Sequence, residues 1–325
     1  MAGPAAAGQP GAGAARIRVG IADPDIDLAV AAAILAPAGA EPVRLRGGWS
    51  GPGLAALIVS PADRVTAADL DRCPGLEIVI TTSTGVDNID TAACRQRGIA
   101  VWHPADYCST EVAESAIAHL TGLLRGITAL DRTVRDGQWH YAAAGPLRRF
   151  DATRLGIVGF GRIGRKVAAR ARALGMQVAA CDPAAGEEVF RESGVSPAGL
   201  EELFATSNAI SVHVPLSPQT RGLIGKPLLD LLPSGSVLVN LARGEVLDTD
   251  ALLAALDSGR LAGAALDVLT AEPPGPGSPA PAHPRLVVTP HMAWYSEQAA
   301  DTLFRRPLEI VRDVILGEPA PGVSS

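Results

Sequence analysis

Three short segments carry side chains that could bind a carboxylate and transfer a proton. The segments are NLARGE (240–245), DVLTAEPP (267–274) and TPHMAWYS (289–296). The guanidinium of Arg243 offers several fixed donors, which suits a carboxylate and a neighbouring keto oxygen. His291 could protonate that oxygen and take the proton back in the reverse direction, while Glu272 would orient the imidazole and stabilise its protonated form. These residue types together suit the reduction of a 2-keto acid.

Each of these side chains also has an ordinary structural interpretation. A histidine near a strand end is more often structural than catalytic, and we apply that interpretation to His103, His119, His140 and His283. A carboxylate in the proline-rich segment around Glu272 would ordinarily face solvent, and Arg243 alone could form a surface ion pair. The joint occurrence of the three segments favours the chemical interpretation.

The elements before these segments explain how their side chains could meet. Each segment follows an apolar, β-branched run that predicts a strand: GSVLVNLA (235–242), GAALDV (263–268) and RLVVTP (285–290). In doubly wound parallel sheets, ligands bind outside the carboxyl ends of the strands. The pattern therefore predicts that Arg243, Glu272 and His291 converge at one sheet edge.

A glycine motif at the start of the same series predicts a dinucleotide site. Gly159, Gly161 and Gly164 form GFGRIG between a predicted strand and a predicted helix, the context in which this motif is informative. They permit the turn, the approach of a pyrophosphate and close helix–strand packing, and Arg162 and Ile163 would supply backbone amides. Asp182 lies 18 residues after Gly164, where its carboxylate can bind ribose hydroxyls and repel a 2′-phosphate. We therefore predict NAD in preference to NADP.

The whole chain alternates short apolar runs with helical stretches, which indicates an α/β fold with parallel sheets. The first series has predicted strands at 17–22, 55–60, 76–82 and 98–102, with helices near 26–36, 66–72 and 90–97. The second has six predicted strands, at 154–164, 176–182, 209–215, 235–242, 263–268 and 285–290. Residues 111–135 predict one long helix, buried on more than one face, that links the domains and supplies a subunit contact. The amphipathic stretch after Trp294 is expected to return to the first domain.

Composition limits the other possibilities. The 325 residues include 28 Lys and Arg against 34 Asp and Glu, a formal charge of −6, and 47% are hydrophobic. This balance predicts two folded domains, and the absence of clustered basic residues argues against a nucleic-acid partner. No stretch of about 18 apolar residues predicts a membrane span, and residues 1–15 predict a disordered tail.

Cysteine usage points to a reducing compartment. Cys73, Cys94, Cys108 and Cys181 form no CxxC pair and no Cys/His cluster at zinc spacing, so we expect no metal site and a cytoplasmic location. Cys108 lies near the proposed cleft, but no base is recognisable beside it, and we interpret it as a packing residue.

At its motifs the chain resembles the D-isomer-specific 2-hydroxyacid dehydrogenase family, over nearly everything from Arg16 to Gly317. The resemblance is carried by TGVDNID (84–90), YCSTEVAES (107–115), GIVGFGRIG (156–164), HVPLSPQTRGLIG (213–225), NLARGEVLDTDAL (240–252) and the His291 motif. AALDVLTAEP and TPHMAWYSEQA are most similar to the branch with the C-terminal-binding-protein corepressors and their bacterial dehydrogenase relatives. The resemblance implies two doubly wound parallel-sheet domains, a Rossmann NAD domain (111–294) inserted in a flavodoxin-like substrate domain (16–110 and 295–325), a cleft between them and a homodimer.

The resemblance also implies roles for individual residues. The catalytic set is Arg243, Glu272 and His291. The cofactor site would comprise Gly159, Gly161, Arg162, Ile163, Gly164, Asp182, His213, Val214, Pro215, Thr220, Leu241, Ala242, Arg243, Asp267 and His291, with Asp267 near the nicotinamide carboxamide. The substrate site would comprise Thr84, Gly85, Val86, Tyr107, Arg243 and Trp294, in which the backbone of 84–86 binds the carboxylate. Many relatives carry Arg where this chain has Thr81, so a second charged substrate group would be recognised differently or be absent.

The sequence thus predicts an NAD-dependent oxidoreductase that interconverts a 2-keto acid and a D-2-hydroxy acid. Two alternatives stay open: an NAD(H)-sensing, corepressor-like binding scaffold, and a reductase of a phosphonate-bearing keto acid. A formate-type dehydrogenase is a further rival, but that resemblance would require Gln where Glu272 stands.

Overall fold

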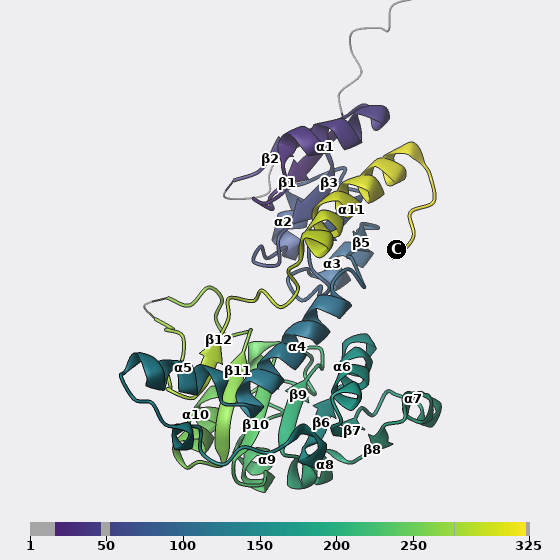
Figure 1. Cartoon of the computed structure of the whole chain (residues 1–325). Coiled ribbons are helices and arrows are strands. Elements are labelled where there is room, and N and C mark those ends of the chain that lie inside the picture. Colours follow the sequence, from purple (N-terminus) through teal and green to yellow (C-terminus); the bar gives the residue numbers. More distant parts are fainter. Residues whose placement is uncertain (1–16, 47–52, 276, 323–325) are drawn as a thin grey trace, which may run out of the picture. The chain divides into compact units, whose positions relative to one another are not determined.

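The computed structural model describes residues 17–46, 53–275 and 277–322. The predicted tail, residues 1–15, lies outside the described residues. The chain divides into two compact units. The first contains the described residues up to Tyr107 together with those from Ala300 onward, and the second is Cys108–Ala299. Figure 1 labels the helices and strands of both units.

The first unit is built on a five-stranded parallel sheet. Its strands are β1 (Ile17–Ile21), β2 (Ala40–Arg44), β3 (Leu54–Val59), β4 (Ile78–Thr81) and β5 (Ala100–Trp102), in the order β2-β1-β3-β4-β5. This is the flavodoxin-like order. The sequence did not predict β2, because AEPVR lacks a clear apolar pattern and contains Pro42. As β2 is an edge strand, it tolerates a residue that cannot donate a ladder hydrogen bond.

Helices cover both faces of this sheet because alternate strand residues point to opposite sides. Ala56 and Ile58 pack with Leu35 of α1 (Leu28–Leu35) and Leu308 of α11 (Glu297–Leu316). Leu57 and Val59 belong to the cluster on the other face, which includes residues of α2 (Ala67–Asp71) and α3 (Thr91–Gln96). The C-terminal helix therefore completes the first unit's core.

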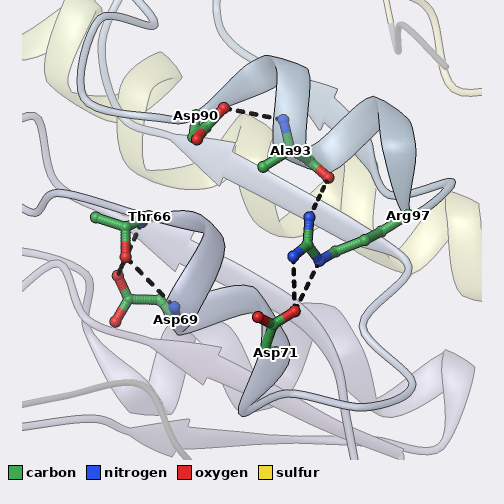
Figure 2. Close-up of polar contacts among 6 residues, drawn as sticks. All are labelled: Thr66, Asp69, Asp71, Asp90, Ala93 and Arg97. Atoms are coloured by element: carbon green, nitrogen blue, oxygen red, sulfur yellow. Dashed lines mark hydrogen bonds and ion pairs between the residues drawn. The ribbon is translucent and has the colours of Figure 1, made fainter.

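Polar contacts fix α2 beside α3, as Figure 2 shows. Thr66 and Asp69 form a capping box at the start of α2, and the Asp90 carboxylate accepts the Ala93 N–H at 2.9 Å at the start of α3. Arg97 donates to Asp71 Oδ1 through Nε and Nη2, at 3.0 and 2.6 Å, and to the Ala93 carbonyl through Nη1 at 3.0 Å. These contacts tie the helix ends together on one side of the sheet.

The second unit is built on a seven-stranded parallel sheet. Its strands are β6 (Arg154–Val158), β7 (Gln177–Cys181), β8 (Ser196–Pro197), β9 (Ala209–Val212), β10 (Ser236–Asn240), β11 (Leu261–Leu266) and β12 (Leu286–Val288), in the order β12-β11-β10-β9-β6-β7-β8. The helices between them include α6 (Arg162–Ala173), α7 (Glu187–Ser193), α8 (Leu200–Thr206), α9 (Lys226–Leu231) and α10 (Thr249–Asp257). The six predicted strands are present, and β8 adds a two-residue edge. The predicted fold class, two doubly wound parallel sheets, is confirmed.

The prediction of one long helix over 111–135 was wrong. The segment forms α4 (Ser109–Leu124) and α5 (Ile127–Arg135), separated at Gly126, whose φ of 64° is left-handed. Glycine adopts this conformation without the penalty that a Cβ imposes. Helix α4 packs against β10, β11 and α6, whereas α5 has no buried residue. The expected burial of several faces therefore holds only for the part before Gly126.

The longest described helix is α11, whose 20 residues include Pro307 and several charged side chains. In the part of the chain that the structure covers, no helix has the length and apolar character needed to cross a membrane.

Candidate active site

The three predicted catalytic residues lie just beyond three neighbouring strands of the second unit. Arg243 follows β10, Glu272 follows β11 and His291 follows β12, and these strands are adjacent and parallel. Parallel neighbours end at the same sheet edge. The topology thus places all three loops together, as the sequence predicts.

Glu272 and His291 form a direct pair. His291 Nδ1 lies 2.5 Å from Glu272 Oε2, and Glu272 Oε1 accepts the Leu269 N–H at 2.6 Å. Burial raises the pKa of the Glu272 carboxyl. Hydrogen bonds from His291 and Leu269 and the charges of His291 and Arg243 lower that pKa by more, so the net shift is downward. Glu272 therefore stays ionised and holds the imidazole by one nitrogen, which leaves Nε2 for proton transfer.

Arg243 is held in a tight turn that follows β10. The buried Asn240 side chain donates to the Arg243 carbonyl at 2.9 Å and accepts the Ala242 N–H at 3.0 Å. Arg243 Nη1 donates to the Ala242 carbonyl at 2.8 Å. A Cβ on Gly244 would lie 2.1 Å from the Leu269 carbonyl carbon, so only glycine lets this turn approach the loop that carries Glu272. The sequence analysis missed Asn240 and Gly244, although both stand within NLARGE.

Asp267 holds the loop that carries His291. Its buried carboxylate accepts the Thr289 hydroxyl at 2.5 Å, the Met292 N–H at 3.0 Å and the Ala293 N–H at 2.9 Å. The Asp267 carbonyl also accepts the His291 N–H at 2.8 Å. His291 has a φ of 50°, a left-handed conformation. It costs a non-glycine residue about 1–3 kcal/mol and persists only where the surrounding structure imposes it. Asp267 and its donors impose it here.

Helix α4 supports the same loop from the other side. Ser115 donates to the Ala293 carbonyl at 3.2 Å, and Ser296 donates to the Glu111 carboxylate at 2.8 Å. His119, also on α4, has its pKa lowered by burial, with the Asp267 charge opposing that shift. Two helical turns of α4 therefore fix the chain on the C-terminal side of His291.

The glycine motif has the geometry of a dinucleotide loop, in which close contacts require glycine at Gly159 and Gly164. Gly159 has a φ of 93°, and a Cβ there would lie 2.6 Å from the His213 carbonyl oxygen. A Cβ on Gly164 would lie 2.2 Å from the Gly159 carbonyl oxygen. A Cβ on Gly161 would meet no atom within 4 Å and would project into open space at the start of α6. That start carries no side-chain cap, so the first-turn amides, including those of Arg162 and Ile163, suit a pyrophosphate.

Asp182 ends the neighbouring strand β7 and is fixed by two backbone amides. Its Oδ2 accepts the Phe160 N–H at 2.7 Å, and its Oδ1 accepts the Ala184 N–H at 2.9 Å. The carboxylate thereby ties the glycine loop to β7. Each of its oxygens keeps a lone pair that can accept a ribose hydroxyl.

The segment expected on the adenosine side packs against the glycine loop. His213 Nε2 lies 2.7 Å from the Ser211 hydroxyl, and burial lowers the pKa of His213 to about 4, so the ring is neutral. The Thr220 hydroxyl donates to the Pro215 carbonyl at 2.6 Å. Val214 approaches the position of a Gly159 Cβ within 2.9 Å. The side chains of His213 and Thr220 are thus hydrogen-bonded within the protein.

Three further predicted residues lie in the same unit. Leu241 is buried and Ala242 half-buried in the turn after β10, and Trp294 lies edge-on to Tyr295 with ring centroids 5.6 Å apart. The predicted role of Trp294 in a pocket wall stays a prediction.

The remaining predicted substrate residues lie in the first unit. Thr84, Gly85 and Val86 follow β4, and Tyr107 lies in the segment after β5. Thr81 is fully buried, and its hydroxyl faces Ser83 and Asn88. The prediction that a second charged substrate group is recognised differently or is absent, because Thr81 stands here, stays a prediction.

Lys166 makes a contact between two helices that the sequence did not predict. Its Nζ donates to the Ser109 and Thr110 hydroxyls at 2.7 and 2.8 Å and so links α6 to the start of α4. Among the described residues, no group of three or more His, Cys, Asp or Glu side chains is arranged to hold a metal ion.

Comparisons with known proteins place the chain in one family. A family model described as D-isomer specific 2-hydroxyacid dehydrogenase, NAD binding domain, matches residues 117–293. The chain is 35% identical over 260 residues to a glycerate dehydrogenase from Methylorubrum extorquens, covering 78% of this chain and 80% of that protein. It is 37% identical over 248 residues to a D-3-phosphoglycerate dehydrogenase from Archaeoglobus fulgidus, covering 76% and 47%. A solved D-lactate dehydrogenase from Aquifex aeolicus, complexed with NAD and lactic acid, has a TM-score of 0.83 and 26% identity, covering 93% and 96%.

The chain therefore belongs to the D-isomer-specific 2-hydroxyacid dehydrogenase family, and residues 117–293 match its NAD-binding domain. This confirms the family and the NAD cofactor predicted from the sequence. The chain spans about half the length of the phosphoglycerate dehydrogenases it matches. The narrower likeness to the corepressor branch stays a prediction.

Proposed function

We propose that the protein is an NAD-dependent dehydrogenase that interconverts a 2-keto acid and a D-2-hydroxy acid. The observation that carries the proposal is the His291–Glu272 pair, 2.5 Å apart, at the sheet edge that also bears Arg243. A histidine held by an ionised carboxylate is suited to exchange one proton with a reacting oxygen. The D configuration rests on family membership.

Each side chain has one role in this reaction. His291 protonates the keto oxygen from Nε2 during reduction and accepts the hydroxyl proton during oxidation. Glu272 orients the imidazole, and its own charge stays in place at neutral pH because its pKa is lowered. Arg243 binds the substrate carboxylate and polarises the keto oxygen. The nicotinamide, when bound, supplies or accepts the hydride.

The remaining assignments extend the site. We assign dinucleotide binding to residues 111–294 and substrate binding to 16–110 with 295–325. The amides of Thr84, Gly85 and Val86 would bind the substrate carboxylate, while Tyr107 and Trp294 would contact the substrate side chain. Asp182 favours NAD over NADP because a carboxylate repels a 2′-phosphate. The backbone of 213–215 would line the adenosine side, and Leu241, Ala242 and Asp267 the nicotinamide side.

A homodimer is part of the proposal. Large apolar side chains are exposed along α5 and the segment after it: Ile127, Val134, Trp139, Tyr141 and Leu147. Trp139 and Tyr141 are 86% and 85% exposed. Several large exposed apolar side chains within one segment favour a protein partner, and a second copy of the chain would cover them. We expect size-exclusion chromatography with light scattering to give twice the mass of one chain. The Trp139→Glu variant should give the mass of a single chain.

We also place the enzyme in the cytoplasm. All four cysteines are free thiols, and Cys73, Cys94 and Cys108 are buried, which suits a reducing compartment.

The test is the absorbance of NADH or NADPH with purified protein and a panel of 2-keto acids that includes aromatic, branched, dicarboxylic and phosphonate members. We expect NADH oxidation with at least one member by the wild type and none by His291→Ala. Silence across the panel while NADH binds would favour a sensing scaffold, and a response limited to the phosphonate would favour that alternative substrate. Silence without NADH binding would contradict the dinucleotide assignment itself.

A further inference from the structure

The loop 83–86 is connected to the interior of the first unit by a chain of hydrogen bonds. Asn88 Nδ2 lies 3.3 Å from Thr81 Oγ1, Thr81 Oγ1 lies 3.0 Å from Ser83 Oγ, and Ser83 Oγ lies 2.6 Å from the Gly85 carbonyl oxygen. Thr81 is fully buried, while Ser83 and Gly85 are half-buried. The chain therefore runs from the core to the loop.

The hydrogens in this chain can be arranged in only one direction. A hydroxyl has one hydrogen, and that of Ser83 is given to the Gly85 carbonyl. The contact between Thr81 and Ser83 must then be donated by Thr81. Because the Thr81 hydrogen is used there, its oxygen can only accept, and Asn88 Nδ2, whose two hydrogens serve three acceptors, shares one of them with Thr81 at 3.3 Å. Hydrogen bonds aligned in this way polarise one another.

The Asn88 end of the chain is firmly anchored. The same Nδ2 also donates to the Ser60 carbonyl at 3.1 Å and to the Asp63 carbonyl at 3.0 Å. The Asn88 carbonyl accepts the Val65 N–H at 2.9 Å, and the Asp90 N–H donates to the Val65 carbonyl at 2.9 Å. The side chain and the carbonyl of Asn88 are thus both bound to the segment after β3.

The Gly85 end of the chain determines where an amide points. The Gly85 carbonyl and the Val86 N–H belong to one peptide group, which is trans, so the two bonds point in opposite directions. Because the carbonyl points to the Ser83 hydroxyl, the Val86 N–H points in the opposite direction. Among the described residues, the N–H groups of Gly85 and Val86 have no acceptor, and successive amides in a turn can bind an anion.

We propose that Asn88, Thr81 and Ser83 are positioning residues that orient and polarise the Gly85–Val86 peptide, so that its N–H binds the substrate carboxylate. This inference rests on the proposed function, which assigns the carboxylate to residues 84–86. The chain of hydroxyls would make that amide a stronger donor and hold it in place before substrate arrives. Such preorganisation reduces the ordering that binding would otherwise require.

The test compares Thr81→Val, which removes the hydroxyl but keeps the side-chain shape, with Thr81→Ser, which keeps the hydroxyl, and with Ser83→Ala. Asp90→Ala is the matched control, since it removes a side-chain to backbone contact two residues from Asn88 that does not belong to the chain (Figure 2). The measurements are KM and kcat for the best keto acid, and the Kd of oxamate, an unreactive carboxylate of similar shape, in the presence of NADH. Thermal unfolding establishes that each variant is folded.

We expect Thr81→Val and Ser83→Ala to raise KM and the oxamate Kd about tenfold, with kcat and the NADH Kd within about twofold, because carboxylate binding is lost equally from ground and transition states. Thr81→Ser should restore the wild-type values, and the double variant Thr81→Val/Ser83→Ala should be no worse than either single one, since the chain is already cut. Asp90→Ala should leave KM unchanged.

Values for Thr81→Val and Ser83→Ala that match the control, or effects that multiply in the double variant, would overturn the positioning role while the proposed function stands. A wild type that neither oxidises NADH nor binds oxamate would overturn the proposed function and the inference with it. If the wild type binds oxamate but shows no turnover, the positioning role is judged from the oxamate Kd values of the variants and the control alone. Ser83 is half-buried, so Ser83→Ala decides the matter even if Thr81→Val does not fold.

Discussion

Both sheets carry a buried carboxylate just beyond the carboxyl end of a strand, but the two are partnered differently. Asp23 follows β1 in the first unit and is 3% exposed, while Asp267 follows β11 in the second and is 2% exposed. Asp23 accepts the Thr82 hydroxyl and the N–H of Asp25, two residues along its own loop. Asp267 accepts three donors from the distant loop that bears His291.

The local partners of Asp23 do not offset the effect of its burial. Burial raises the pKa of Asp23, the hydrogen bonds from Thr82 and Asp25 lower it, and the charges of Asp25 and Asp63 raise it again, so the net shift is upward. Arg44 lies close by, but it donates to the Asp23 and Ile26 carbonyls. Asp23 therefore closes its own loop at an electrostatic cost, whereas Asp267 accepts hydrogen bonds that hold the loop bearing His291.

The largest effect is expected from removing the side chain that Asp267 positions. His291→Ala should lower kcat by about 10²–10⁴, the usual contribution of general acid–base catalysis, with NADH binding unchanged. Steady-state kinetics and NADH fluorescence titration measure the two quantities. Unchanged turnover would remove His291 from the reaction and leave the Asp267 contacts without a catalytic purpose.

Asp267→Ala should reduce both turnover and stability. It leaves the Thr289 hydroxyl, the buried Ala293 amide and the part-buried Met292 amide without their acceptor, which we expect to lower the free energy of unfolding by about 3 kcal/mol. The His291 loop would also lose the contacts that impose its left-handed conformation, so kcat should fall by about tenfold or more. Urea unfolding and kinetics are the measurements.

The matched control for this variant is Asp230→Ala in the same unit. Asp230 is exposed and pairs with Lys226, so its loss should change stability by less than about 0.5 kcal/mol and leave turnover intact. Equal effects of the two substitutions would contradict the special position of Asp267.

A third carboxylate at a strand end, Asp182, extends the comparison to cofactor choice. Asp182→Ala removes both the acceptor for a ribose hydroxyl and the repulsion of a 2′-phosphate. We expect the preference for NADH over NADPH, measured as a ratio of Kd values, to fall by about tenfold or more. Because Asp182 also holds the Phe160 amide at 2.7 Å, NADH affinity itself should decrease. An unchanged ratio of Kd values would show that Asp182 only holds the glycine loop and does not select the cofactor.

The smallest effect concerns Asp23 and pH. An acid whose pKa is raised on folding binds its proton more tightly in the folded state, so it favours folding at low pH, and that contribution is lost as pH rises through the raised pKa. Asp23→Asn should therefore flatten the decline in stability between about pH 4 and pH 7, by about 1 kcal/mol or less. Urea unfolding at several pH values measures this slope.

Glu272→Gln serves as the control of opposite sign. Its pKa is lowered on folding, so its contribution is present above the unfolded value and is lost only as pH falls below it. The stability of this variant should parallel the wild type between about pH 5 and pH 7. A wild-type slope that Asp23→Asn leaves unchanged would show that Asp23 is not its source.

Local rules explain why much of the site could be predicted. The glycine motif and the strand-end positions of Arg243 and His291 depend on a few consecutive residues, so pattern and topology place them correctly. The pairing of Glu272 with His291, 19 residues apart, needed the family resemblance as well. The break at Gly126 was missed because a single glycine within an apolar helical pattern is often tolerated.

What escaped prediction depends on distant partners. The contacts of Asp267 join it to residues 22 to 26 positions further on, and no periodicity reports them. The Thr81 hydroxyl likewise meets Asn88, seven residues further on, and no sequence pattern indicates that contact. Edge strands β2 and β8 were missed because one contains Pro42 and the other has only two residues.

The scarcity of lysine gives the second unit an internal chemical marker. The sequence contains only Lys166 and Lys226. The Lys226 side chain is 75% exposed, whereas the Lys166 amine is half-buried and donates to two hydroxyls between α6 and α4. An acylating reagent should therefore modify Lys226 first and reach Lys166 only when those helices part. The order of acylation would then record the opening of the NAD domain, without any engineered label.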